Sequence, residues 1–377
     1  MPEEQNPPEQ PIPVTTLDLE LLKREVDQQF PFYDVKYDLN TAVFFCRIDE
    51  TTLEEKFTLL RRSLSEKGYI PMLRYEQGEH LIYVIKKPKS KTKPIWINLA
   101  LFIATIITTT LAGSLQWVSI YNKDLIEMIS PYYLGQGFVF FSVPLLLILG
   151  VHEMGHYYAS KKHNVEASLP YFIPLPPPLF TLGTFGALIS TREPIPDRKS
   201  LLDIGAAGPI CGFLVAIPVA LLGFYFMQQN PIPPPTSNGE GITIMYPLVL
   251  QFFSSFFTIP ANTIIHPTAF AGWVGLFVTG MNLLPIGQLD GGHVSRALFK
   301  EKSKYIAWAA IAIIIGLGFF YAGWLIIAIF VVFLLGTQHP APLNELHPLD
   351  SRRKIIGIIA LLIFILCFTS IPISTSS

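Results

Sequence analysis

The segment His152-Glu153-Met154-Gly155-His156 lies within a long apolar run, residues 138–160 (FVFFSVPLLLILGVHEMGHYYAS). Residues four apart project from one face of a helix, so the imidazoles of His152 and His156 can bind one divalent metal ion, most naturally zinc. Glu153 can then act on a metal-activated water without being a ligand. Ionisable side chains inside a membrane helix are unfavourable by several kcal/mol unless they are paired or coordinated. This motif therefore indicates a functional site.

The composition favours a polytopic α-helical membrane protein. Of the 377 residues, 50% are hydrophobic and only 15% are charged, and the mean hydropathy is +0.43. Several nearly uncharged runs are long enough to cross a hydrocarbon layer of about 30 Å. A net charge of −1 gives no reason to propose nucleic acid as a partner. The three cysteines form no C-x-x-C pattern, so they suggest neither a disulfide framework nor a cysteine metal site.

The polar N-terminal part predicts a small soluble domain. Residues 1–14 are rich in Pro, Glu and Gln and are expected to be a disordered tail, followed by a soluble α+β domain over residues 15–90. No catalytic cluster is visible there, so a substrate-selecting module and a simple solubilising cap both remain open. The predicted elements are a helix with apolar residues on one face over 19–30, a strand over 43–48, a helix that starts at a Thr52–Glu55 capping box and stops near Gly68, and a hairpin over 69–85.

Charges flanking the spans predict the topology. Lysines precede the first span, residues 95–118, and Lys161 and Lys162 follow the second, so both flanks are expected on the cytoplasmic side. The N-terminus is then cytoplasmic, and the His-Glu motif lies in the half of its helix nearer the cytoplasm. The lysines before the first span are Lys86, Lys87, Lys89, Lys91 and Lys93.

The stretch over residues 169–190 (LPYFIPLPPPLFTLGTFGALIS) cannot form a regular helix because of its prolines. Irregular backbone at membrane depth is tolerated only against protein or a wet cavity, which predicts a re-entrant segment beside the metal. Residues 184–189 could be an edge strand that holds an extended peptide by main-chain hydrogen bonds. A plain structural loop is the alternative.

The remaining apolar runs complete a transmembrane domain over residues 95–372. The third span, residues 203–227, opens with the small residues of 204–209 (IGAAGP), which would let it pack closely against the His-Glu helix. Residues 245–257 are too short to span and are expected at the interface. Further spans are predicted over 267–284, twice within 305–336 with a break at its glycines, and over 355–372, which makes about seven crossings.

A second polar motif, residues 282–292 (NLLPIGQLDGG), ends the span over 267–284 on the same side as the first motif. A catalytic zinc site has three protein ligands and one open position, and the carboxylate of Asp290 is the natural third ligand. Pro285 and the glycine pair that follows Asp290 break the helix, which lets this carboxylate turn inward.

The order H-E-x-x-H, then N-x-x-P-x-x-x-L-D-G, resembles the site-2 protease family of intramembrane zinc metalloproteases. The stretch over 266–299 is similar to the branch typical of cyanobacteria and chloroplasts, and the resemblance covers about residues 95–350. It implies His152, His156 and Asp290 as Zn²⁺ ligands, Glu153 as the catalytic general base, and Asn282 as a substrate-binding residue.

The resemblance further implies hydrolysis of peptide bonds within or near the transmembrane helices of protein substrates. It implies a multi-pass protein of the lipid bilayer, in a cell inner membrane or a thylakoid-type membrane. The N-terminal domain lies outside the resembling core and carries no recognisable PDZ signature.

Two other classes of protein remain possible from the residues. A non-catalytic zinc-binding scaffold would not need Glu153 as a base, and a divalent-cation transporter would place polar residues along several spans. Of the other histidines, His163 is expected to be a flanking residue, His266 structural, and His293 a surface residue at the start of a helix. His339 and His347 lie in residues 339–350 (HPAPLNELHPLD), which are expected to be a packed loop, with metal binding as the alternative.

Overall fold

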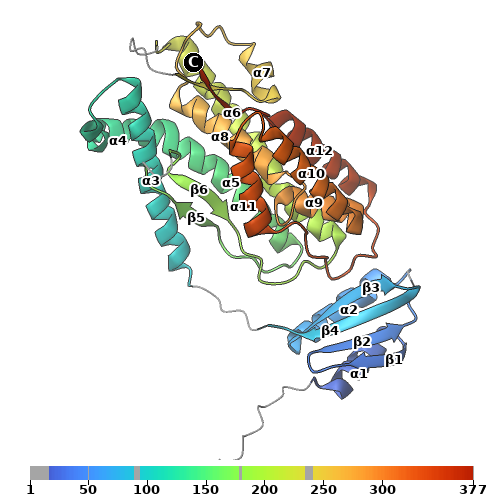
Figure 1. Cartoon of the computed structure of the whole chain (residues 1–377). Helices are drawn as coiled ribbons and strands as arrows, with labels where there is room; N and C mark the ends of the chain where they lie inside the picture. The colour runs from blue at the N-terminus through green and yellow to red at the C-terminus, as the bar shows by residue number, and fades with distance from the viewer. Residues whose placement is uncertain (1–16, 50, 89–93, 178–180, 234–240, 377) are drawn as a thin grey trace, which may run out of the picture. The chain divides into compact units, whose positions relative to one another are not determined.

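The computed structural model describes residues 17–49, 51–88, 94–177, 181–233 and 241–376 (Figure 1). The tail predicted over 1–14 lies outside the described residues. The chain forms two compact units. One comprises Met1–Lys91 together with Pro342–Pro348, and the other comprises Thr92–Ala341 together with Leu349–Ser377. The N-terminal unit therefore includes a short segment from far along the chain.

The N-terminal unit is a four-stranded antiparallel sheet in the order β1-β2-β4-β3, with two helices packed on it. The core is made by the apolar stripes of the helices, including Leu22 and Leu60, and by inward residues of the strands, including Phe44 and Ile82. The elements are α1 (Leu19–Asp27), β1 (Phe32–Tyr37), β2 (Thr41–Cys46), α2 (Leu53–Glu66), β3 (Tyr69–Glu76) and β4 (Glu79–Lys86). Strand β1 was not predicted from the sequence.

The turns of this unit follow local chemistry, with one exception. Gln77 and Gly78 have φ of 53° and 88° and close the predicted β3–β4 hairpin. Gly68, with φ of 81°, follows the end of α2, as predicted. The capping box predicted at Thr52 is wrong. Thr52 is the N-cap residue, but its φ and ψ of −106° and 1° are not extended, and its side chain makes no capping hydrogen bond.

A buried carboxylate links the two helices of this unit. Glu25 is 6% exposed, and it accepts hydrogen bonds from Lys67 Nζ, 2.6 Å away, and from the Ser63 hydroxyl. The hydrogen bond from Lys67, followed by that from Ser63, holds the pKa of Glu25 below its ordinary value. A lowered folded-state pKa adds stability above the unfolded pKa, and this stability is lost as the pH falls through the folded pKa.

We expect Glu25→Gln to destabilise the N-terminal unit by about 1 kcal/mol at pH 7, a modest value because Lys67 is one-third exposed. The difference from wild type should shrink as the pH falls through the lowered folded-state pKa of Glu25, because the carboxyl is then protonated and no longer pairs with Lys67. Amide hydrogen exchange in α1 and α2, compared between wild type and Glu25→Gln at the same pH, measures this difference in stability. The control is Glu20→Gln, because Glu20 also pairs with a lysine, Lys23, but its side chain is 86% exposed. Equal protection in wild type and Glu25→Gln at pH 7 would contradict the expectation.

The second unit is mostly helical. Among the described residues, three helices are long and apolar enough to cross a membrane: Trp96–Ile120, Pro131–Lys162 and Arg198–Gln229. They are α3 (Trp96–Ile120), then α4 (Pro131–Gly137) continued through a π-helical turn into α5 (Val143–Lys162), and α6 (Arg198–Gln229). The first three predicted spans are therefore confirmed as helices of spanning length, while seven crossings are not established by length alone.

The C-terminal half of this unit contains shorter helices. Residues 318–322 interrupt the apolar stretch between α10 and α11, as the glycines predicted. The last helix ends at Cys367, five residues before the predicted end, and a strand follows it. The helices are α7 (Leu248–Ser254), α8 (Pro267–Asn282), α9 (Asp290–Phe299), α10 (Ser303–Leu317), α11 (Gly323–Phe330) and α12 (Ser351–Cys367).

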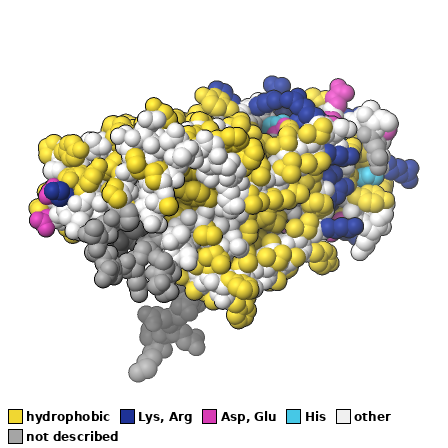
Figure 2. Space-filling model, turned by 90° about the horizontal axis from the view of Figure 1, so that it is seen from above, with side chains coloured by type: hydrophobic (Ala, Val, Ile, Leu, Met, Phe, Trp, Pro, Cys, Tyr) yellow, Lys and Arg dark blue, Asp and Glu magenta, His cyan; other side chains and the backbone are white. Residues whose placement is uncertain are grey.

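Large hydrophobic side chains lie on the surface of this unit. Phe319 and Phe333, for example, are 90% and 83% exposed. Figure 2 shows hydrophobic side chains over much of the visible face. A surface of this kind is suited to lipid, since soluble proteins rarely expose large contiguous apolar patches.

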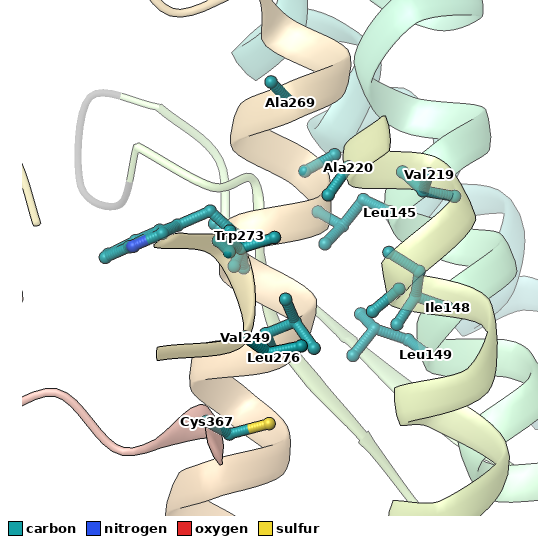
Figure 3. Packing of buried hydrophobic residues seen from close by; sticks show 14 of the residues in the cluster. Leu145, Ile148, Leu149, Val219, Ala220, Val249, Ala269, Trp273, Leu276 and Cys367 are labelled. Carbon is teal, nitrogen blue, oxygen red and sulfur yellow. The ribbon is translucent and has the colours of Figure 1, made fainter. Parts of the chain in front are cut away.

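The core of this unit lies where α5, α6 and α8 pack together (Figure 3). Leu145 and Ile148 of α5 meet Ala220 of α6 and Leu276 of α8 there. Small residues bring the helix backbones close: a Cβ added at Gly223 would lie 2.2 Å from the backbone of Ala269. The close packing predicted between residues 204–209 and the His-Glu helix is also present, because a Cβ added at Gly155 would lie 2.8 Å from Ala207 O.

The described residues of the stretch 169–190 (169–177 and 181–190) form no helix, as predicted. Within them β5 (Tyr171–Pro174) and β6 (Thr184–Leu188) pair as an antiparallel hairpin that lies beside α3 (Figure 1). The rings of Phe172 and Phe102 are 4.9 Å apart, and Asn98 Nδ2 donates to Leu169 O at 2.8 Å. A second two-stranded sheet pairs β7 (Gly241–Ile244) with β8 (Ile373–Ser376).

Candidate metal centre

Three side chains from two distant segments converge in the second unit. His152 and His156 lie one turn apart on α5, with their Nε2 atoms 3.1 Å apart. Asp290 begins α9, and its Oδ2 lies 3.3 Å from Nε2 of each histidine. The histidines are 3% and 6% exposed, so this polar cluster is almost closed to solvent. Among the described residues it is the one His, Cys, Asp and Glu group found with metal-binding spacing.

The separations fit a tetrahedral metal ion. Ligands about 2.0–2.1 Å from zinc in a tetrahedron lie about 3.3 Å from one another. The separations of 3.1, 3.3 and 3.3 Å within the cluster agree with this value. Two imidazoles and one carboxylate are also a known donor set for zinc with one position left open. The residues present therefore fit a catalytic zinc ion.

Helix α6 fixes the orientation of the two imidazoles. His156 Nδ1 donates to Ile204 O at 2.8 Å, which directs Nε2 into the cluster. Two glycines leave space for the rings. A Cβ added at Gly208 would lie 2.0 Å from His156 Nε2, and one added at Gly212 would lie 2.9 Å from His152 Nδ1. The positions of the two imidazoles therefore require glycine at residues 208 and 212 of α6.

A glycine-rich turn places Asp290. Helix α8 ends at Asn282 and α9 begins at Asp290, so seven residues connect the two helices. Gly287 has φ of 50°, and Cβ atoms added at Gly291 or Gly292 would lie 2.0 and 2.2 Å from backbone oxygens of this turn. The glycine pair thus lets the start of α9 pack directly on the turn that carries the carboxylate.

The other two predicted site residues lie beside the cluster. Asn282 Nδ2 is 3.3 Å from His152 Nε2. Glu153 is 6% exposed, and the backbone N–H of Ile189 lies within hydrogen-bonding reach of its carboxylate. Because Ile189 directly follows β6, the end of the hairpin lies next to Glu153. All five site residues predicted from the sequence are therefore brought together.

Two polar groups that support the site were missed in the sequence. Arg198 is buried at 7% exposure, and its guanidinium donates to Ala297 O at 2.8 Å and Leu298 O at 3.3 Å. It thereby binds the C-terminal carbonyls of the helix that begins with Asp290. No local signal separates such an arginine from its exposed neighbours, apart from Asp197, which caps α6 beside it.

The second group is centred on Asp203. Its carboxylate accepts hydrogen bonds from Arg353 Nη2 at 2.7 Å and lies 2.9 Å from His163 Nε2. This network ties the end of α5 and the start of α12 to α6, one residue before the carbonyl that orients His156. His163, expected to be a simple flanking residue, is therefore a partner in this network.

The remaining histidines lie outside the cluster. His266 caps α8 and stacks among aromatic rings, as a structural residue would. His293 and His339 have ring centroids 4.1 Å apart. His293 was expected on the surface, but it is partly buried and donates from Nδ1 to Leu289 O. His347 pairs with Glu54 in the N-terminal unit.

Residues 140–323 match the model of peptidase family M50. The chain is 27% identical to a protein of Oryza sativa subsp. japonica named "Probable zinc metalloprotease EGY1, chloroplastic", over 84% of this chain and 54% of that protein. It is 26% identical to the protein of that name from Arabidopsis thaliana, over 96% of this chain and 72% of that protein. The chain thus spans about half the length of the rice relative. No solved structure matches it.

Proposed function

Since residues 140–323 match the model of peptidase family M50, we propose that this multi-pass membrane protein is a site-2 protease, an intramembrane zinc metalloprotease. Its substrates are membrane proteins, cut within or near their transmembrane segments. The observation that carries the proposal is the convergence of His152, His156 and Asp290, buried in helices of an apolar unit, with Glu153 beside them. A metal ion there gives these ionisable groups a partner.

His152 Nε2, His156 Nε2 and Asp290 Oδ2 are the proposed zinc ligands. A zinc ion in this site acidifies water and polarises the scissile carbonyl. Glu153 takes the proton from the attacking water and later delivers it to the leaving amine, so the carboxylate is regenerated in each turnover. The near-complete burial of the cluster keeps other water from the reacting atoms.

The hairpin beside the site is the proposed substrate-binding edge. A helical peptide bond is shielded by its own hydrogen bonds, so a substrate helix must unwind before it is cut. Strand β6 pairs with β5 on one side, and its end approaches Glu153. Its other edge can pair with the unwound substrate strand by main-chain hydrogen bonds. The proposed role of Asn282 is to hold a substrate carbonyl near the metal, and its position beside His152 supports this role.

We further propose seven crossings with the N-terminus in the cytoplasm or its equivalent. The five lysines before α3 favour that side for the N-terminal unit. Because successive crossings run in opposite directions, the segment after α6 and the end of the chain then lie on the side opposite to the N-terminus. The antiparallel pairing of β7 with β8 supports this, because it requires both to lie on one side of the membrane.

Substitution of Asp290 by Asn tests the metal site. The change keeps the shape of the side chain and removes its negative charge. We expect the purified full chain to lose bound zinc and to cleave a labelled single-span substrate at least about 100-fold more slowly. Elemental analysis and product formation in detergent are the two measurements. Asp124→Asn, at an exposed loop position, is the matched control and should retain both.

Full zinc content and wild-type turnover in Asp290→Asn would overturn the ligand assignment. A wild-type protein that binds zinc without cleaving any single-span substrate would instead favour a scaffold. Uptake of zinc into proteoliposomes would favour a transporter.

A further inference from the structure

The outer edge of the N-terminal sheet carries a segment from a distant part of the chain. Strand β3 is the last strand in the order β1-β2-β4-β3, so one of its edges is not paired within the sheet. Residues 342–348 (PLNELHP) lie along this edge. Leu73 N–H donates to Leu343 O at 2.7 Å, and Leu73 forms a parallel bridge with Asn344. The segment is thus added to the sheet as a very short parallel strand.

Arg74 makes further contacts with the backbone of the segment. Arg74 Nη1 donates to Pro342 O at 2.9 Å and to Leu343 O at 3.1 Å. Main-chain hydrogen bonds of this kind hold any extended peptide irrespective of its side chains, and they supply affinity in strand-addition complexes.

Specific contacts come from two leucines three residues apart. Leu343 is 4% exposed and belongs to the core cluster of the N-terminal unit, and Leu346 is partly buried against the same cluster. Between them Asn344 Oδ1 accepts from Leu346 N–H at 2.9 Å, an Asx turn that directs both leucines to the domain. His347 Nε2 then lies 2.5 Å from Glu54 Oε2.

The rest of the domain forms a continuous core without this segment. Its four strands pair along their lengths, whereas the segment makes a single isolated bridge. Prolines at both ends, Pro342 and Pro348, keep the segment extended and limit its pairing. This arrangement resembles a peptide held on a finished domain more than a strand of the sheet.

We propose that the β3 edge is a peptide-binding site, and that residues 342–348 are its internal ligand. The partner it fits is an extended protein segment of the pattern Pro-Leu-Asn-x-Leu-His, which takes the place of the internal segment. Leucine side chains fill the two apolar positions, an Asn or Asp makes the turn, and a cationic or imidazole side chain meets Glu54. This site is separate from the metal centre and does not depend on the protease assignment.

Residues 342–348 are covalently attached to the domain, and a free peptide must compete with them for the β3 edge. A tethered ligand acts at an effective concentration in the millimolar range, so a free peptide binds only when the internal segment leaves. The apparent affinity for a free peptide is reduced by the fraction of sites that are open. Removal of the internal segment should therefore raise this affinity by at least about 10-fold.

The test uses the full chain in detergent and a fluorescent peptide with the sequence of residues 341–349. In one variant residues 342–348 are replaced by seven Gly and Ser residues. Fluorescence polarisation should show weak binding to wild type and at least about 10-fold tighter binding to this variant. In the variant background, Arg74→Ala should weaken binding. Arg47→Ala, at an exposed position beside Tyr33 toward the β1 side of the sheet, should leave it unchanged.

Amide exchange shows whether the domain remains folded. Leu73 N–H should be protected in wild type, exchange rapidly in the replaced variant and regain protection when peptide is added. Amides of β2 and β4 should stay protected throughout. Loss of protection across β2 and β4 in the variant would overturn the proposal, because the segment would then be part of the fold. Intact protection with no peptide binding would overturn it equally.

Discussion

Glu153→Gln is expected to abolish cleavage while bound zinc stays at the wild-type level. The substituted amide has the shape of the carboxylate but cannot accept and return a proton, and general acid–base catalysis contributes about 10²–10⁴-fold to the rate. Glu153 is not among the clustered ligand atoms, so the metal site should remain intact. Product formation from a labelled single-span substrate, with zinc quantified in the same samples, measures both effects.

The matched control is Glu127→Gln, in the η1 turn (Leu125–Ile129) after α3 and away from the cluster. It should preserve both zinc content and rate. A Glu153→Gln protein that contains zinc and turns over substrate at the wild-type rate would exclude Glu153 as the base. Loss of zinc in Glu153→Gln would show that the carboxylate supports the metal site itself.

Gly208→Ala is expected to remove zinc and activity through a single methyl group. The added Cβ would lie 2.0 Å from His156 Nε2 and 2.4 Å from its Cδ2, so the imidazole must leave its position. Alanine favours a helix by about 1 kcal/mol relative to glycine, so helix α6 itself should not be weakened. We expect a loss of cleavage of about 10–100-fold, the usual effect of disturbing the residues around metal ligands.

Gly316→Ala is the matched control for this prediction. Gly316 lies in α10, and a Cβ added there would meet no atom within 4 Å. The control should keep zinc and activity, because it makes the same chemical change in a helix without a collision. Normal zinc content in Gly208→Ala would show that the packing of α6 on the metal cluster is looser than described.

Much of the site could be predicted because its residues follow local rules. His152 and His156 are one helical turn apart, and Asp290 sits where proline and glycines break a helix on the same side of the membrane. The small residues over 204–209 likewise predicted close helix packing. Gly208, however, lies directly against the His156 ring. This contact depends on the register between α5 and α6, which no local sequence pattern encodes.

The predictions that failed depend on backbone geometry or on distant partners. Thr52 has the residue type and spacing of a capping box, but its backbone angles keep its side chain from the helix. Strand β1, Phe32–Tyr37, lies mostly exposed at the edge of the sheet, so it lacks the buried alternation that marks a strand. Residues 342–348 lie within 339–350, which the sequence predicts to be a packed loop, and nothing near them in the sequence indicates that they join the N-terminal domain.

The discontinuous N-terminal unit has a consequence for biosynthesis. A chain leaves the ribosome from its N-terminus, and domains generally fold as they emerge. Residues 17–88 are therefore made first, but Leu343, one of the buried residues of the same unit, is made only after α3 to α11. Throughout that interval none of the described residues made so far pairs with the edge of β3. Closure of the edge thus marks a molecule whose helices up to α11 have already been synthesised.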